Sequence, residues 1–187
     1  MKKVVVPLAD GVEEMEAVII IDVLRRAGWE VTGAAVKRDC APAQLVVKGS
    51  RGVKILADTS WYLIEQDVFD ILVLPGGSEG TQRLMSESSV LDAIRKFVQQ
   101  GKIVGAICAA PLVLQEAGVL SGRRATCHPS LWHKLSSAVL NKDRVVADGK
   151  ILTSQGPGTA MEFALEIIKL VEGQKRFEAV AVPMVIK

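Results

Sequence analysis

Cys108 stands where an apolar stretch, residues 103–107, gives way to Ala-Ala-Pro. The apolar stretch predicts a buried strand, and Pro111 suits the first turn of a helix, where a missing N–H costs little. A cysteine at such a junction points out of both packed elements, and the N–H groups that follow it favour a thiolate. The alternative is a cysteine that merely packs in the core. The junction favours a nucleophile.

Glu16 is a second candidate because it lies in a predicted helix, residues 11–30, that is unusually apolar between Met15 and Leu24. Such a helix needs cover on two sides, either from the rest of the fold or from another subunit. Glu16 would then be partly buried, and burial raises a carboxyl pKa until the group can donate a proton near neutral pH. A solvated acid in the first turn is equally consistent with this spacing.

His128 precedes a proline, which keeps it extended at the end of a predicted short strand. It is either a general base for Cys108 or an ordinary loop histidine. Together with Cys127 and His133 it could form part of a metal site. No acidic or cysteine partner stands at metal-site spacing from these three residues, so we expect no metal site. The absence of both Gly-rich nucleotide motifs, GxGxxG and GxxxxGK[ST], makes a nucleotide cofactor unsupported.

Glycines follow two of the predicted strands, at Gly76-Gly77 and at residues 156–158. Glycines in these places let the backbone approach a ligand and present N–H groups to an oxyanion. They also serve as tight turns, which is the commoner reason for such pairs.

The remaining sequence predicts the elements that position these residues. Strands alternate with amphipathic helices, a pattern typical of a layered α/β domain with a mostly parallel sheet, and we expect a single domain over residues 1–187. Sites in such sheets form beyond the carboxyl ends of the strands. We expect a loop at residues 38–50 and an edge strand or hairpin arm at 51–58. The other predictions are strands at 2–9, 31–36, 69–77 and 103–108, helices at 88–102, 109–118 and 156–173, and a hairpin at 143–155.

Composition narrows the class of partner. Hydrophobic residues make up 49% of the chain and aromatic ones only 4%, so the core must be built from small aliphatic side chains, as in a parallel sheet. The 23 basic and 21 acidic residues are scattered, which argues against nucleic-acid binding. Three cysteines without CxxC spacing, Cys40, Cys108 and Cys127, predict a reducing compartment. With no signal peptide or apolar span, we expect a cytoplasmic protein that is not bound to a membrane.

Five segments taken in order, DGVEEMEAV, DILVLPGG, GAICAAP, CHP and LTSQGPGTAMEFAL, resemble the DJ-1/ThiJ/PfpI superfamily and specifically its DJ-1-like branch. The resemblance implies a flavodoxin-like three-layer sandwich with helices on both faces of the sheet. It also implies that Cys108 is the reactive nucleophile, that Glu16 hydrogen-bonds it and that His128 lies nearby. Gly77 and Ala109 match positions whose backbone N–H groups face the site, and the preceding Gly76 belongs to the same expected oxyanion and substrate-binding loop.

The same resemblance implies a homodimer formed through the first helix, which would cover its apolar second side. Met15, Arg26 and Arg51 match positions near that interface. One departure bears on activity, because the protease-like branch has a histidine after its cysteine whereas this chain has Ala109. A Cys-His peptidase dyad of that kind is therefore not expected.

The function that the resemblance implies is a glutathione-independent glyoxalase or deglycase that uses Cys108 on methylglyoxal-type aldehydes, without a metal or organic cofactor. The addition of a thiolate to an aldehyde, followed by proton transfer through Glu16 or His128, suits these residues. The alternative is a redox sensor or chaperone in which Cys108 oxidises to sulfinic acid without significant catalysis.

Overall fold

The centre of the fold is a seven-stranded sheet. The structure is a computed structural model that describes residues 1–38, 41 and 45–186. All neighbouring strands pair in parallel except β10, which is antiparallel to β11. When β1, β2, β6, β7 and β11 are counted 1 to 5 along the chain, their spatial order β2–β1–β6–β7–β11 is the 2-1-3-4-5 order of flavodoxin-like sheets. This confirms the predicted fold class. The full order is β10 (Val145–Asp148), β11 (Ile151–Ser154), β7 (Ile103–Ile107), β6 (Ile71–Leu74), β1 (Lys3–Leu8), β2 (Glu30–Ala35) and β5 (Thr59–Ser60).

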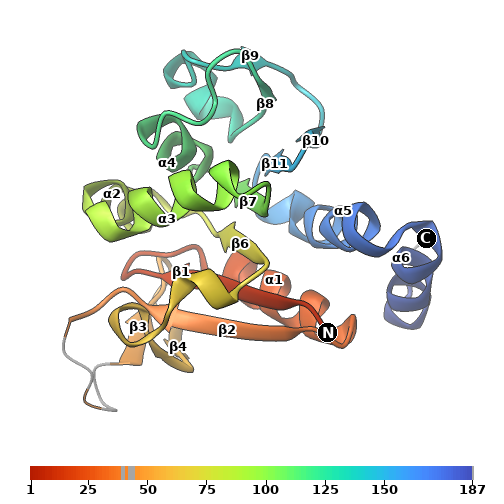
Figure 1. Cartoon of the computed structure of the whole chain (residues 1–187), viewed down its shortest axis with the longest axis horizontal. Helices are drawn as coiled ribbons and strands as arrows, with labels where there is room; N and C mark the ends of the chain where they lie inside the picture. Colours follow the sequence, from red (N-terminus) through yellow and green to blue (C-terminus); the bar gives the residue numbers. More distant parts are fainter. Residues whose placement is uncertain (39–40, 42–44, 187) are drawn as a thin grey trace.

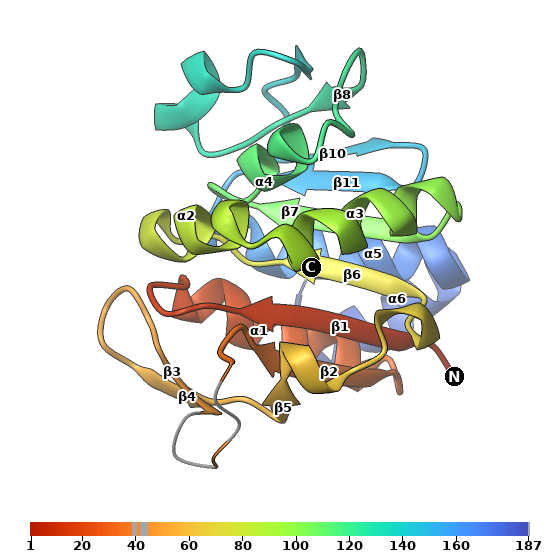
Figure 2. The same cartoon turned by 60° about the vertical axis from the view of Figure 1, so that its left-hand side comes forward.

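Helices cover both faces of the sheet and complete the three layers (Figure 2). Side chains of β1 alternate between two apolar clusters, with Val4 and Val6 on one face and Val5 on the other, as the pleat of a strand requires. Within the described residues, no helix combines the length and apolarity needed to cross a membrane. One face carries α1 (Glu14–Arg26), α5 (Ala160–Glu172) and α6 (Gln174–Ala181), and the other carries α2 (Ser78–Ser86), α3 (Ser88–Gln99) and α4 (Pro111–Glu116).

Two small strand pairs lie at opposite ends of the molecule (Figure 1). The antiparallel hairpin of β3 (Val46–Lys48) and β4 (Lys54–Leu56) is at one end, and the parallel pair β8 (Arg124–Ala125) and β9 (Val139–Leu140) is at the other. Short 3-10 turns complete the chain at Trp61–Leu63, Gln66–Val68, Pro129–Lys134, Pro157–Thr159 and Val182–Met184.

Differences from the sequence predictions concern short elements. The predicted loop at 38–50 contains β3, and of the two alternatives for 51–58 the hairpin arm is correct. The predicted helix at 156–173 starts with a 3-10 turn before α5, and α6 was not predicted. The hairpin around Asp148-Gly149 is confirmed. Cys40 lies outside the described residues.

Phe163 on α5 supplies a test of how the helix is held on the sheet. Its ring is fully buried and fills the space above Gly105 of β7, where an added Cβ would lie 3.0 Å from Phe163 Cζ. We expect Phe163→Ala to lower the free energy of unfolding by about 3–5 kcal/mol in denaturant titrations, because a cavity is left behind. Met161→Ala, on the exposed side of the same helix, should change it by less than about 0.5 kcal/mol. Equal losses in the two variants would contradict this packing.

Candidate active site

Three segments meet at the carboxyl ends of adjacent parallel strands. Glu16 lies in the first turn of α1, which follows β1, while Gly76 and Gly77 follow β6 and Cys108 follows β7. The strand order reverses between β1 and β6, and such a switch point leaves a crevice at the strand ends. The topology therefore brings together residues that are far apart in the sequence.

Cys108 occupies a strained turn between β7 and α4. Its φ is +65°, a left-handed value that residues other than glycine rarely adopt and that costs on the order of 1–3 kcal/mol. Both of its backbone polar groups are held: its N–H donates to Ser154 O at 2.9 Å, and its carbonyl accepts the N–H of His128 at 2.8 Å. These two bonds fix the direction in which the side chain leaves the turn.

The Glu16 carboxyl is fully buried, which confirms the first of the two alternatives for this residue. The Gly76 N–H donates to its Oε2 at 2.7 Å, and the Cys108 thiol also interacts with the carboxyl. Its Oε1 has no hydrogen-bond partner within the described residues. Burial raises the pKa of Glu16 to about 7, opposed by the Gly76 N–H and the thiol, and a negative charge on Glu13 raises it further. Glu16 therefore exchanges its proton near neutral pH.

Burial is the largest cause of the shift in the pKa of the Cys108 thiol, which is raised to about 12. A negative charge on Glu16 is the next cause. The N–H groups of Gly77 and Ala109 face the sulfur and lower the pKa, as the turn predicted, but they do not compensate for burial. The expectation of an acidified thiol is therefore wrong for this site. The sequence could not reveal how deeply the sulfur lies.

Glu16 and Cys108 titrate as one coupled pair, because the charge on either group changes the free energy needed to ionise the other. When Glu16 is ionised its charge opposes a thiolate, whereas a protonated Glu16 removes that charge and can donate a hydrogen bond to sulfur. Moving the thiol proton onto Glu16 keeps one negative charge in the pair. The carboxylate is therefore placed to receive the thiol proton as the sulfur forms a new bond.

Gly76 and Gly77 are glycines because there is no room for a side chain. A Cβ on Gly76 would lie 2.6 Å from the Cβ of Cys108 and 2.8 Å from Glu16 Oε2. Gly77 has a φ of +93°, and its Cβ would lie 2.3 Å from the carbonyl oxygen of Gly11. The expected role of Gly76 as an oxyanion donor is corrected, since its N–H is already bonded to Glu16.

Comparison with known proteins places this site in a family. The sequence pattern of the DJ-1/PfpI family matches residues 2–170. The chain belongs to the DJ-1/PfpI family. It is 44% identical over 182 residues to protein dj-1beta of Drosophila melanogaster, covering 96% of this chain and 95% of that protein. It is 32% identical over 177 residues to the glutathione-independent glyoxalase DJR-1.2 of Caenorhabditis elegans, covering 94% and 91%.

Solved structures of the family support the same fold. Oxidized DJ-1 of Toxoplasma gondii superposes with a TM-score of 0.93 at 36% identity, covering all of this chain and 99% of that one. Some family members are much longer: protein DJ-1 homolog B of Arabidopsis thaliana is 40% identical over 188 residues, but this chain spans only 42% of its length.

The backbone N–H of His128 donates to the carbonyl of Cys108, which places the residue next to the site. The ring Nδ1 is hydrogen-bonded to the hydroxyl of Ser130 at 2.8 Å, and the ring lines an open depression of about 200 Å³ beside Gly156. In the described part of the chain, the contacts of the Cys108 thiol come from Glu16 and the N–H groups of Gly77 and Ala109. No group of three or more potential metal ligands is found among the same residues.

Cys127, the thiol next to His128, is fully buried in the apolar cluster behind the sheet. Burial raises its pKa to about 11, and because the side chain is fully buried, solvent oxidants do not reach it. Of the two described cysteines, only Cys108 is partly exposed.

Two residues of the site were missed from the sequence. Glu13 accepts the N–H of Glu16 on its Oε2 at 2.8 Å and donates its own N–H to the carbonyl of Gly76, so it joins α1 to the glycine loop. Glu13 stands just before the helix, a position typical of an N-cap, and this could have indicated its bond with the N–H of Glu16. Ser154, whose carbonyl holds Cys108, carries no such signal, because any residue has a carbonyl.

The raised pKa of Glu16 predicts a specific dependence of stability on pH. Its folded-state pKa of about 7 exceeds the ordinary 4.5, so its stabilising contribution is complete below about 4.5 and is lost as pH rises through about 7. Glu16→Gln removes this titration. We expect the wild type to lose up to about 3 kcal/mol relative to the variant between pH 4.5 and 8, measured by urea unfolding.

Glu79→Gln, at an exposed acid on α2, provides the control and should follow the wild type across this range. A difference between wild type and Glu16→Gln that stays constant with pH would contradict the buried ionisation.

Proposed function

We propose that the protein is a cysteine-dependent, glutathione-independent glyoxalase that acts on methylglyoxal-type 2-oxoaldehydes and their early adducts. The observation that carries the proposal is the buried Glu16 carboxyl, with a pKa of about 7, in contact with the thiol of Cys108 at a strained turn. A family relative named as a glutathione-independent glyoxalase supports it.

The first step joins the thiol to the aldehyde. The sulfur of Cys108 attacks the aldehyde carbon, a C–S bond forms, and the Glu16 carboxylate takes the thiol proton. The carbonyl π electrons move to oxygen, which receives that proton to give a hemithioacetal. The N–H groups of Gly77 and Ala109 face the sulfur, so we assign them to its developing negative charge rather than to the substrate oxygen.

The second step moves a proton between adjacent carbons. Glu16, again a carboxylate, removes the C–H proton of the hemithioacetal to form an enediolate and returns that proton to the neighbouring carbon. The hydroxyl proton of the hemithioacetal passes to the former ketone oxygen, and a thioester results. Water then cleaves the thioester, so that lactate forms and the thiol is restored. The overall change is methylglyoxal plus water to lactic acid, with no external oxidant or reductant. Glu16, which touches the thiol, suits the base role better than His128.

Turnover of methylglyoxal to lactate tests this assignment. Cys108→Ser should abolish activity, and Glu16→Gln should lower kcat/KM by about 10²–10⁴-fold, the usual contribution of a general base. The wild-type rate should rise with pH through about 7, because only ionised Glu16 can accept the proton. His128→Ala should cost less than about tenfold, since its ring is bonded to Ser130. Cys127→Ala is the matched thiol control and should keep activity.

No lactate above the buffer rate from the wild type would overturn the proposal. Full activity in Cys108→Ser would overturn both this proposal and the alternative below.

The second candidate is a redox sensor or chaperone that uses the same thiol. Cys108 is the partly exposed thiol, and a protonated Glu16 beside it can donate a hydrogen bond to a sulfinate. A family member has been solved in an oxidized form. Mild peroxide that adds two oxygens to Cys108, seen by intact mass, in a protein without lactate production would favour this candidate.

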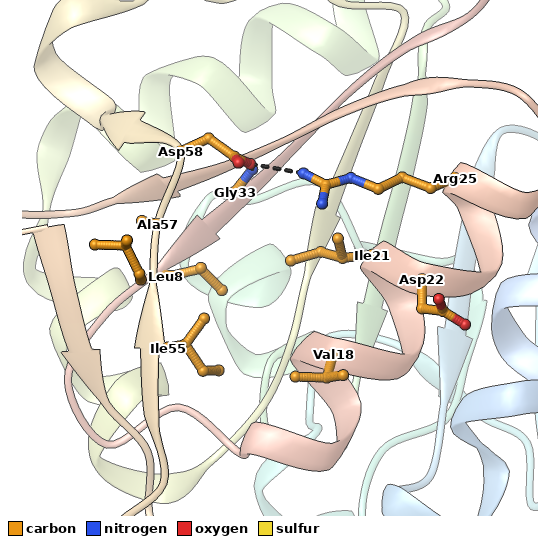
Figure 3. A pocket seen from close by; sticks show the side chains of 10 residues that line it. Leu8, Val18, Ile21, Asp22, Arg25, Gly33, Ile55, Ala57 and Asp58 are labelled. Atoms are coloured by element: carbon orange, nitrogen blue, oxygen red, sulfur yellow. Dashed lines mark hydrogen bonds and ion pairs between the residues drawn. The ribbon is translucent and has the colours of Figure 1, made fainter.

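The predicted homodimer also stays a proposal, supported by an uncovered apolar face. We define the hairpin face as Met15 and Val18 on α1 together with Val53 and Leu56 of the β3–β4 hairpin, all exposed. A cavity of about 260 Å³ opens between α1 and the hairpin, with Val18 directed toward it (Figure 3). A second copy of the chain would cover this face.

Other charged groups brace or surround the hairpin face. Arg25 of α1 bonds Asp58 at 2.8 Å beside the cavity (Figure 3). Arg26 pairs with Asp22 on the same helix, and the buried Glu14 accepts the backbone N–H of Arg51 at 2.8 Å. We propose that Arg26 and Arg51 lie near this interface, as the resemblance implies.

Sedimentation velocity at micromolar concentration tests the dimer. We expect the wild type to sediment as a dimer and Val18→Asp as a folded monomer, because two carboxylates would be buried near each other across the interface. Val139→Asp, at an equally exposed valine on β9 at the other end of the molecule, should remain dimeric. A monomeric wild type would remove the proposal.

A further inference from the structure

Two cavities open at the amino ends of the parallel strands, at the opposite edge of the sheet from Cys108. One, of about 220 Å³, lies where β6 and β7 begin, and the other, of about 280 Å³, lies between β7 and the turn of the β10–β11 hairpin. This edge is on the right of Figure 2, near the N-terminus. The cavities share Gly101, Lys102 and Lys150, so we treat them as two lobes of one basic double cavity.

The lining of the basic double cavity is strongly cationic. Its charged residues are four cations and one carboxylate, whereas the whole chain has a net charge of only +2. The lining is therefore more positive than the chain as a whole, although it holds only four of the 23 basic residues. The charged lining residues are Lys2, Asp70, Lys102, Arg123 and Lys150.

The nearby acids do not neutralise this charge. Asp70 uses one carboxylate oxygen to accept the backbone N–H of Lys3 at 2.9 Å. Asp148 lies outside the lining, accepts the backbone N–H of Arg124 at 2.9 Å and approaches Arg123 only to 3.5 Å. Two carboxylates thus face four cations, and both are partly engaged by backbone.

The lysine ammonium groups that line the cavity have N–H donors that are not used within the described part of the chain. The side-chain ammonium groups of Lys2 and Lys150 make no hydrogen bond or ion pair within residues 1–38, 41 and 45–186. Lys102, on the wall that the two lobes share, is held in place because its Nζ donates to Asp67 O at 2.8 Å and lies 5.1 Å from the ring centre of Phe97. An ammonium carries three donors, so the Lys102 group can still donate to a ligand. Like charges around one hollow repel each other, and an anion between them relieves that repulsion.

The size of the lobes decides the kind of anion. Each is smaller than the roughly 300 Å³ at which pockets for drug-sized ligands begin, so each suits one small charged group. Lysines act as point-charge partners for phosphate. We propose that the basic double cavity binds a diphosphate-like anion where its two lobes meet, with the side chains of Lys102 and Lys150, which line both lobes, as its donors.

The test is a titration of ¹⁵N-labelled wild type with inorganic pyrophosphate at low ionic strength, followed by amide chemical shifts. We expect saturable shifts confined to residues 101–103 and 149–151, weakened by added salt because exposed charges are screened. Orthophosphate, which fills one lobe, should bind about tenfold more weakly than pyrophosphate.

Variants separate this site from general surface charge. Lys150→Gln should weaken pyrophosphate binding about tenfold, whereas Lys134→Gln, which makes the same charge change at an exposed lysine of the Pro129–Lys134 turn, should leave it unchanged. Shifts that spread over the surface without saturating, equal binding of the two anions, or equal losses in the two variants would each overturn the proposal. Alkylation of Cys108 should be unaffected by Lys150→Gln, so the outcome is independent of the proposed glyoxalase activity.

Discussion

The burial of the Glu16 carboxyl group is the constraint on which the structure around it depends. A carboxyl without access to water must find donors inside the protein, and here they are the Gly76 N–H and the Cys108 thiol. The N–H can reach Glu16 only because residue 76 has no side chain, and the thiol can reach it only because Cys108 adopts a left-handed turn. The strain, the glycine and the perturbed proton affinities are thus linked consequences of a single placement.

The sheet explains why these groups meet. In the 2-1-3-4-5 order, β1 and β6 are neighbours whose following segments leave toward opposite faces, and the space between them is open at the carboxyl edge. Glu16 enters that space from α1 and Cys108 from the next strand along. The same arrangement exposes the outer side of α1 beside the hairpin, so the helix that carries the acid also carries the surface proposed for a second subunit.

Much of this could be predicted from sequence because it depends on local signals. The apolar run ending at Ile107 and the proline at 111 defined the Cys108 junction, and Asp148-Gly149 defined the hairpin. The short α6 follows Gly173 with no long apolar stripe, and β3 is only three residues, so neither pattern was strong enough to detect. Family resemblance, not spacing, linked Glu16 to Cys108.

What could not be predicted depends on long-range geometry. The direction of the thiol pKa shift follows from the depth of the sulfur and the charge of Glu16, and neither is encoded near Cys108. The orientation of the His128 ring depends on its bond to Ser130, which one sequence cannot distinguish from a bond to the nucleophile. The Gly76 N–H was expected to bind an oxyanion, but it donates to Glu16. A free N–H and one that is already bonded cannot be distinguished in a sequence.

The backbone bonds of Cys108 have a consequence for how the protein can diversify. Its N–H and carbonyl tie the end of β7 to Ser154, the last residue of β11, and to His128 after β8, so three segments are joined at one residue. Such a brace prevents the nucleophile from shifting by loop motion alone. For the proposed function, adaptation to different aldehydes would come from changes in side chains, while the frame that aims the sulfur remains unchanged.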